Sequence, residues 1–182
     1  MKLHKDVEEV LLSHEEIVLK CEELGKQISI DFEGKKPIFI GLLKGVVPFM
    51  AELIKHIDIE MEIDFIDVSS YDGVSSTGKV KLLKDVTCDV TNRHVVFVED
   101  IIDTGLTLSE VIKMFEAKNI ASCEIVTLID KPEGRKIHSV NPKYIGFNIP
   151  NKFVIGFGLD YNEYYRNLPY VGVLKRSVYE NN

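Results

Sequence analysis

The sequence is poor in cysteine and histidine, and neither residue type is arranged as in a known site. Its three cysteines, Cys21, Cys88 and Cys123, are odd in number and share no CxxC spacing. This argues against a disulfide framework and indicates small buried residues in a reducing cytosol. The five histidines show neither HxxxH nor HExxH spacing, so we expect no transition-metal site.

Long apolar runs and a surplus of basic residues are also missing. No stretch approaches the roughly 18 apolar residues that cross a bilayer, and the first residues do not resemble a signal peptide. We therefore expect a cytoplasmic protein that does not bind membranes. Lys and Arg total 22 against 29 for Asp and Glu, a net charge of −7. Because nucleic-acid binders usually need a basic surplus, we expect no nucleic-acid partner.

What the sequence contains is the composition of an ordinary globular domain. Hydrophobic residues make up 45% of the chain and charged residues 28%. A chain of 182 residues buries roughly 70% of its unfolded surface, enough for a core without metal or disulfides. We find no internal repeat, low-complexity tract or linker. The sequence therefore predicts a single domain over residues 1–182.

Apolar patterns typical of strands alternate with patterns typical of helices. A capping box at Ser13 and Glu16 begins a helix whose apolar face contains Ile17, Cys21, Leu24 and Ile28. Further helices are predicted from Pro48 and over residues 108–117. Strands are predicted at residues 37–43, 59–65, 80–86, 95–98, 122–130, 144–147, 153–157 and 170–174. This alternation predicts an α/β domain with a mostly parallel sheet.

The strand predicted at residues 59–65 has a two-residue period. Its odd-numbered residues are apolar and its even-numbered residues are acidic. This alternation predicts a half-exposed strand, with Ile63 on the apolar face and Asp64 on the polar face.

The most informative segment is residues 95–107, with the sequence VVFVEDIIDTGLT. We expect a buried strand to end at Glu99 and Asp100, followed by a short loop and a helix. In open α/β sheets, ligands bind outside the carboxyl ends of the strands. The adjacent carboxylates would repel phosphate, so they are expected to face sugar hydroxyls or a hydrated Mg²⁺.

The loop after these carboxylates has the chemistry of a phosphate site. Backbone N–H groups at the start of the helix, with the hydroxyls of Thr104 and Thr107, suit a phosphate monoester. Gly105 lets the backbone approach the phosphate without a Cβ clash. The pattern GxxxxGK[ST] is absent, so this is not a Walker loop. The alternative is a solvated turn in which Asp103 and Thr104 only cap the helix.

Residues 98–105, VEDIIDTG, resemble the signature of the purine phosphoribosyltransferases, and the likeness extends over residues 37–166. The resemblance implies a type I phosphoribosyltransferase fold and Mg²⁺-dependent purine salvage. Phosphoribosyl would pass from phosphoribosyl pyrophosphate (PRPP) to a 6-oxopurine base, hypoxanthine or guanine, giving IMP or GMP and pyrophosphate. It further implies a flexible lid at residues 69–79, a hood formed by the N-terminal segment and residues 144–182, and a homodimer or homotetramer.

By position, the resemblance also implies the residues of the site. Those around the ribose and its phosphate are Glu99, Asp100, Asp103, Thr104, Gly105, Leu106 and Thr107. Those around the pyrophosphate are Lys44, Gly45, Ser70, Tyr71 and Arg166. Those around the purine base are Lys131, Phe153, Val154 and Asp160. The implied Mg²⁺ ligands are Glu99, Asp100 and Asp160.

Four of these residues have specific implied roles. Asp103 is the candidate general base for the purine ring proton, or it orients the base and stabilises positive charge. Lys131 would read the exocyclic oxygen of the base. Phe153 would stack on the base while the backbone of Val154 meets its edge.

Several alternatives stay open. Taken singly, Lys44-Gly45 is a strand end with a solvated lysine, Lys131 is a surface lysine, and the aromatic segment at residues 153–162 is core. A phosphoribosyltransferase that uses xanthine or a pyrimidine is the first rival function. A non-catalytic regulator that keeps the PRPP fold and binds RNA or DNA is the second, and PRPP synthetase, which needs a longer chain, is the third.

Overall fold

The computed structural model describes residues 2–70 and 80–180. The lid predicted at residues 69–79 lies almost entirely outside these ranges, as does Tyr71. The side chain of Ser70 is also outside the described part of the chain. The pyrophosphate contacts expected of Ser70 and Tyr71 therefore stay predictions.

A central sheet of six strands organises the chain. The strands are β2 (Ile38–Leu42), β3 (Glu62–Ser70), β4 (Val80–Lys84), β5 (His94–Ile102), β6 (Ser122–Asp130) and β7 (Tyr144–Asn148). Their order is β4-β3-β2-β5-β6-β7; all neighbours are parallel except β4, which pairs antiparallel with β3 at one edge. This confirms the predicted α/β fold with a mostly parallel sheet.

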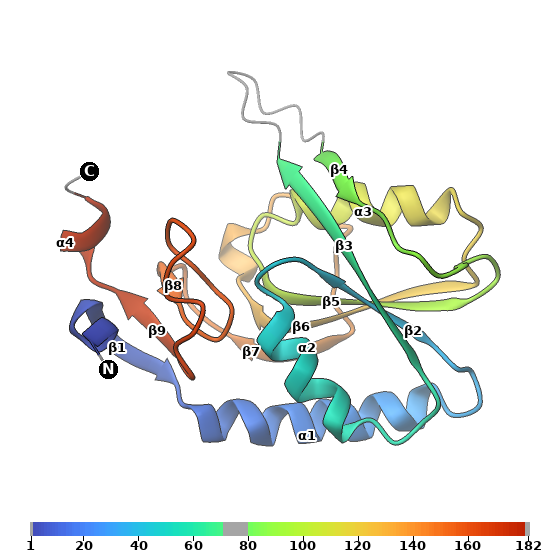
Figure 1. Cartoon of the computed structure of the whole chain (residues 1–182), viewed down its shortest axis with the longest axis horizontal. Helices are drawn as coiled ribbons and strands as arrows, with labels where there is room; N and C mark the ends of the chain where they lie inside the picture. Colours follow the sequence, from blue (N-terminus) through green and yellow to red (C-terminus); the bar gives the residue numbers. More distant parts are fainter. Residues whose placement is uncertain (1, 71–79, 181–182) are drawn as a thin grey trace.

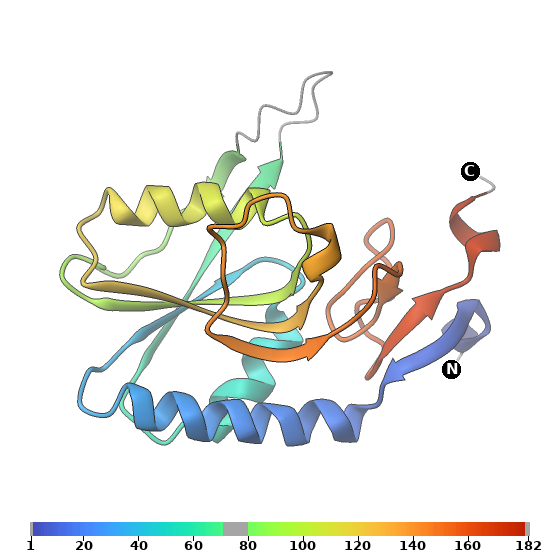
Figure 2. The ribbon, with the colours of Figure 1, turned by 180° about the vertical axis from the view of Figure 1, so that it is seen from behind.

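Helices cover both faces of this sheet, as Figures 1 and 2 show. The longer helices are α1 (His14–Asp31), α2 (Val47–Leu53) and α3 (Leu106–Glu116). Phe39 and Val96 point into the core shared with α1 and α2, whereas Ile40 and Phe97 point into the core shared with α3. Strands buried on both faces explain the continuous apolar runs of the sequence. Shorter turns of helix are η1 (Lys2–Asp6), η2 (Ile54–His56), η3 (Pro132–Gly134) and α4 (Arg176–Tyr179).

The capping box predicted at the start of α1 is present. The Glu16 amide donates to Oγ of Ser13 over 3.2 Å, and Oε2 of Glu16 accepts from the Ser13 amide over 2.8 Å. These two bonds satisfy amides that the helix start leaves without partners. The predicted apolar face is also confirmed, because the following four residues are buried: Ile17, Cys21, Leu24 and Ile28.

A second sheet joins the two ends of the chain. Its strands are β1 (Val7–Leu12), β8 (Val154–Ile155) and β9 (Val171–Leu174), in the antiparallel order β1-β9-β8. It lies to one side of the central sheet, near both termini (Figure 1). β8 is shorter than the predicted strand because φ is positive at Gly156 (94°) and Phe157 (47°), which turns the chain out of the ladder. That this sheet acts as a hood stays a prediction.

Two predictions about the strands are wrong. β5 does not end at the two carboxylates Glu99 and Asp100 but continues to Ile102, because its pairing with β6 extends to Ile102 and Asp130. In β3, Phe65 packs against the core with α1 and α2 as expected, but Ile63 is 49% exposed and the expected exposed carboxylate, Asp64, is only 9% exposed.

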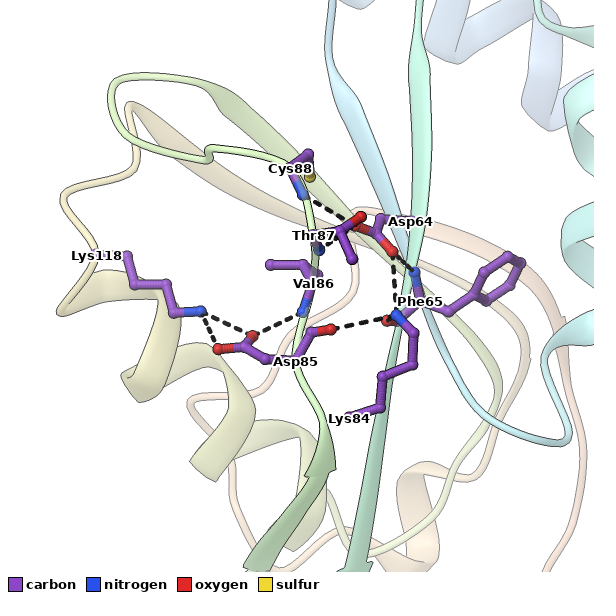
Figure 3. A network of polar contacts seen from close by, with 8 residues as sticks. All are labelled: Asp64, Phe65, Lys84, Asp85, Val86, Thr87, Cys88 and Lys118. Atoms are coloured by element: carbon purple, nitrogen blue, oxygen red, sulfur yellow. Dashed lines mark hydrogen bonds and ion pairs between the residues drawn. The ribbon is translucent and has the colours of Figure 1, made fainter.

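The burial of Asp64 has a polar cause, drawn in Figure 3. Oδ2 of Asp64 accepts from the Thr87 amide (2.6 Å), the Thr87 hydroxyl (3.0 Å) and the Cys88 amide (3.2 Å). Oδ1 accepts from the Phe65 amide (2.7 Å) and the Lys84 ammonium (3.3 Å). A buried carboxylate is tolerated when it is hydrogen-bonded in this way.

In the described part of the chain, no helix combines the length and apolar character that crossing a bilayer requires.

Candidate functional site

The predicted phosphate loop lies between β5 and α3. Gly105 is the N-cap of α3, with φ 77° and ψ 1°, a left-handed conformation that glycine adopts without strain. The loop lines an open pocket of about 410 Å³. The structure therefore brings together six residues predicted for the ribose and phosphate, all of which line this pocket: Glu99, Asp103, Thr104, Gly105, Leu106 and Thr107.

Arg135 fixes the backbone of the predicted phosphate loop. Its Nε donates to the Asp103 carbonyl over 3.1 Å, Nη1 donates to the Val140 carbonyl over 2.5 Å, and Nη2 pairs with the Asp130 carboxylate. The side chains of Arg135 and Asp130 are each 8% exposed. The Thr104 carbonyl is held as well, by the amides of the two residues after Arg135. Sequence reasoning missed Arg135, because a single arginine after a strand carries no distinctive pattern.

Gly134 fixes the space that is open to the Asp103 side chain. A Cβ atom at Gly134 would lie 2.0 Å from Oδ1 of Asp103, too close for any real contact. Asp103 is half-exposed, and its Oδ2 lies 3.9 Å from Nζ of Lys131. The turn η3, which contains Gly134, therefore limits where the candidate general base can lie.

A second pocket of about 540 Å³ adjoins the first at Asp103 and Ile101, which line both. The structure brings together here the residues predicted for the purine base, with a predicted metal ligand. Phe153 is 42% exposed, and its ring stacks on Tyr179 at 5.2 Å. The pocket is lined by Asp100, Ile101, Asp103, Lys131, Phe153, Val154, Leu159 and Asp160.

Lys131 is a buried residue that lines this second pocket. Its side chain is 7% exposed, and Nζ donates to the Lys152 carbonyl over 2.7 Å. Burial lowers the pKa of Lys131 below its ordinary value, and the Asp103 carboxylate partly offsets this effect. The interpretation of Lys131 as a solvated surface lysine is therefore wrong. A buried ammonium is available as a hydrogen-bond donor to a ligand.

Glu99 and Asp100 are adjacent in β5 but line different pockets. Glu99 lines the phosphate-loop pocket and Asp100 lines the second pocket, as expected for neighbouring residues of a strand. Burial and the charge of Asp100 raise the pKa of Glu99 well above its ordinary value. Burial also raises the pKa of Asp100 to about 6, although the Ile101 amide and Arg166 act against this shift. Within residues 2–70 and 80–180, no three acidic, histidine or cysteine side chains are grouped as a preformed metal cage.

Asp100 packs against the predicted pyrophosphate loop. A Cβ atom at Gly45 would lie 1.8 Å from Oδ2 of Asp100, so only glycine fits there without displacing the carboxylate. Gly158 approaches from the other side: its φ is 101°, and a Cβ atom there would lie 1.8 Å from the Gly45 carbonyl oxygen. The peptide bond between Leu43 and Lys44 is cis. The loop, the carboxylate and the turn after β8 are thus in close contact.

The two predicted pyrophosphate cations are brought together by an acidic residue that was not predicted. Nζ of Lys44 lies 3.0 Å from Oε2 of Glu163. Nη2 of Arg166 lies 3.4 Å from Oε1 of Glu163 and 2.9 Å from Oδ1 of Asp160. Nη1 of Arg166 donates to the Gly158 carbonyl over 2.8 Å. Glu163 follows a predicted strand and shows no pattern of its own, so the sequence did not single it out.

Comparison with known proteins identifies the family. The Phosphoribosyl transferase domain family matches residues 8–162. The hypoxanthine-guanine phosphoribosyltransferase of Streptococcus pneumoniae is 54% identical over 180 residues, covering 98% of this chain and 99% of that protein. The enzyme of the same name from Streptococcus mutans is 54% identical over 178 residues, covering 97% of this chain and 98% of that protein.

Solved structures agree with these matches. A hypoxanthine phosphoribosyltransferase from Staphylococcus aureus has a TM-score of 0.95 and 48% identity, covering 98% of this chain and 97% of that chain. A hypoxanthine-guanine phosphoribosyltransferase from Bacillus anthracis has a TM-score of 0.89 and 44% identity, covering 93% and 99%. The chain therefore belongs to the phosphoribosyl transferase domain family.

Proposed function

We propose that the protein transfers phosphoribosyl from PRPP to N9 of hypoxanthine or guanine in a Mg²⁺-dependent step of purine salvage, giving IMP or GMP and pyrophosphate. The names of the relatives support this substrate class. The observation that carries the proposal is that a phosphate-loop pocket and an aromatic pocket adjoin at Asp103. A phosphorylated sugar in the first pocket would meet a planar base in the second.

The second pocket favours a 6-oxopurine over adenine. Lys131 is buried there, and an ammonium group donates hydrogen bonds but cannot accept them. It therefore suits a carbonyl oxygen on the base and would oppose an amino group at the same position. Phe153 and the backbone of Val154 line the same pocket, where a stacking ring and a backbone contact would orient the base.

The carboxylates fit magnesium that takes most of its ligands from water and substrate. Mg²⁺ usually binds proteins through one or two carboxylates, so the absence of a preformed cage among the described residues is compatible with it. Asp100 and Asp160 line one pocket and would hold the ion there, while Glu99 would face the ribose. When bound, Mg²⁺ would supply positive charge to the departing pyrophosphate.

The protein's own groups would carry the remaining steps. As pyrophosphate leaves, C1′ of the ribose becomes cationic, and negative charge grows on the leaving group. Lys44, the amides near Gly45 and Arg166 would stabilise that leaving charge. Asp103 would accept the purine ring proton or hold the base by electrostatic attraction.

We also expect the protein to be a cytoplasmic homodimer or homotetramer.

The test is a product assay with five bases. Purified protein is mixed with PRPP and Mg²⁺, and hypoxanthine, guanine, xanthine, adenine or uracil is added separately. Nucleotide and pyrophosphate are then quantified. We expect nucleotide from hypoxanthine and guanine, and none from adenine or uracil. Nucleotide from xanthine alone would favour the xanthine rival.

An Asp103→Ala variant tests the site. It should lose nucleotide formation while still binding PRPP, because the phosphate contacts come from the loop amides and threonines. Native protein that binds PRPP but forms no nucleotide from any base would contradict the enzyme function and favour a non-catalytic regulator.

A further inference from the structure

The carboxylate of Glu163 forms ion pairs with both cations that are predicted to bind pyrophosphate. Its two oxygens reach Lys44 and Arg166, which come from segments far apart in the sequence. Lys44 follows β2, whereas Arg166 and Glu163 belong to the turn after β8. A single carboxylate thus bridges two positive charges, as a diphosphate would do with more charge.

The turn that presents Glu163 is shaped in an unusual way. φ is positive at Asn162 (52°), Glu163 (68°) and Tyr165 (74°), a region that residues other than glycine seldom adopt. The Glu163 amide donates to Oδ2 of Asp160 over 2.9 Å, which ties the turn to a predicted metal ligand. The backbone therefore directs this carboxylate toward the cations.

Stability alone does not account for this arrangement. The side chains of Lys44 and Glu163 are each 62% exposed, and exposed ion pairs contribute little to folding. Arg166 has in addition a buried Nε with no hydrogen-bond partner among the described residues. An unpaired buried donor is unfavourable, so a ligand that reorients the guanidinium group would be favoured.

Resting on the proposed function, we propose that Glu163 is the internal counter-ion of the pyrophosphate site. In the free site it holds Lys44 and Arg166 in place, and the diphosphate of PRPP displaces it. When pyrophosphate leaves, the carboxylate returns to the cations. Glu163 is thus a positioning residue that weakens the binding of the leaving group and speeds its release, a step that often limits turnover.

The experiment measures the Kd of pyrophosphate with Mg²⁺ by titration calorimetry, for native protein and for Glu163→Gln. Glutamine keeps the shape and removes the competing charge. Because exposed ion pairs are weak, we expect Glu163→Gln to lower the Kd by about two- to fivefold. The KM for PRPP should fall in parallel, and the KM for the purine should not change.

Salt provides a readout that a purely structural role would not alter. The Debye length shortens from about 10 Å at 0.1 M ionic strength to about 3 Å at 1 M. The difference in Kd between native protein and Glu163→Gln should therefore shrink as salt is raised.

The matched control is Glu60→Gln. Glu60 forms an exposed pair with Lys36 at 2.5 Å, just before β3 and thus at the opposite end of the parallel strands from the site. The control changes the net charge equally, so its pyrophosphate Kd should equal the native value.

The counter-ion inference and the proposed function would be contradicted by two different results. If native protein binds pyrophosphate and Glu163→Gln binds it equally or more weakly, the counter-ion inference is wrong and the proposed function survives. If native protein neither binds pyrophosphate with Mg²⁺ nor forms nucleotide, the proposed function itself fails.

Discussion

Gly134 shows how one missing side chain can set the position of Asp103, the proposed general base. Its backbone is not in the left-handed region, so alanine would not strain the turn. The added Cβ would nevertheless lie 2.0 Å from Oδ1 of Asp103. That oxygen is at the free end of a flexible side chain. We therefore expect the Asp103 carboxylate to move aside while the protein stays folded.

We therefore expect Gly134→Ala to lower kcat/KM by about ten- to a hundredfold, because a misplacement of about 1 Å can cost that much. The melting temperature should stay close to the native value. Steady-state kinetics and thermal unfolding check the two effects. The control is Glu133→Ala at the neighbouring exposed position, which should keep native activity. Full activity in Gly134→Ala would mean that the position of Asp103 is not critical.

At the scale of elements, the loop between β5 and α3 depends on Arg135. This arginine joins the loop carbonyl of Asp103 to Asp130 at the end of β6 and to the Val140 carbonyl. Removing one partner of a buried ion pair leaves the other charge without compensation, which typically costs about 3–5 kcal/mol.

Arg135→Met should therefore lower the free energy of unfolding by about 3–5 kcal/mol. It should also weaken PRPP binding, because the loop amides lose their support. Urea unfolding and PRPP titration measure these effects. Arg176→Met is the matched control: Arg176 is 79% exposed and pairs with Glu180 at 3.9 Å, so little change is expected. A native PRPP Kd in folded Arg135→Met would contradict the supporting role.

Sequence patterns predicted the elements better than the contacts between them. The capping box at Ser13 and the apolar runs of β2 and β6 are local signals, and the structure confirms them. Arg135 and Glu163 have common residue types and act through partners distant in the sequence. No spacing along the chain could have identified them.

Asp64 also shows that a local sequence pattern does not predict contacts between distant segments. Its alternation with apolar neighbours predicts an exposed carboxylate, but the chain from β4 to β5 returns across β3 and covers it. Tertiary packing, and not the alternating pattern, decided that Asp64 is buried. A periodic pattern shows only that two faces differ.

At the scale of the whole molecule, buried and bridging carboxylates make the fold sensitive to acid. Asp64 ties β3 to the chain before β5, and Asp85 ties the end of β4 to Lys118 after α3 (Figure 3). Burial alone would raise the pKa of Asp64. Hydrogen bonds from the amides of Thr87, Phe65 and Cys88 outweigh burial and hold this pKa well below its ordinary value of 3.8.

Because the folded-state pKa of Asp64 is depressed, the carboxylate stabilises the fold fully above its ordinary pKa. That contribution is lost as the pH falls below the ordinary value toward the folded-state pKa. Asp64→Asn should lower the free energy of unfolding by about 1–3 kcal/mol at neutral pH, since an amide cannot accept all these bonds. The difference from native protein should narrow progressively below about pH 4.

Urea unfolding across this pH range measures the effect. Thr87→Val removes one donor and leaves the amides, so it should give a smaller loss with the same narrowing in acid. The pH dependence distinguishes stabilisation by the charge of Asp64 from stabilisation by the packing of its side chain. A difference that stays constant from neutral pH into acid would show that Asp64 acts through packing, and that its charge does not hold β3 to the rest of the fold.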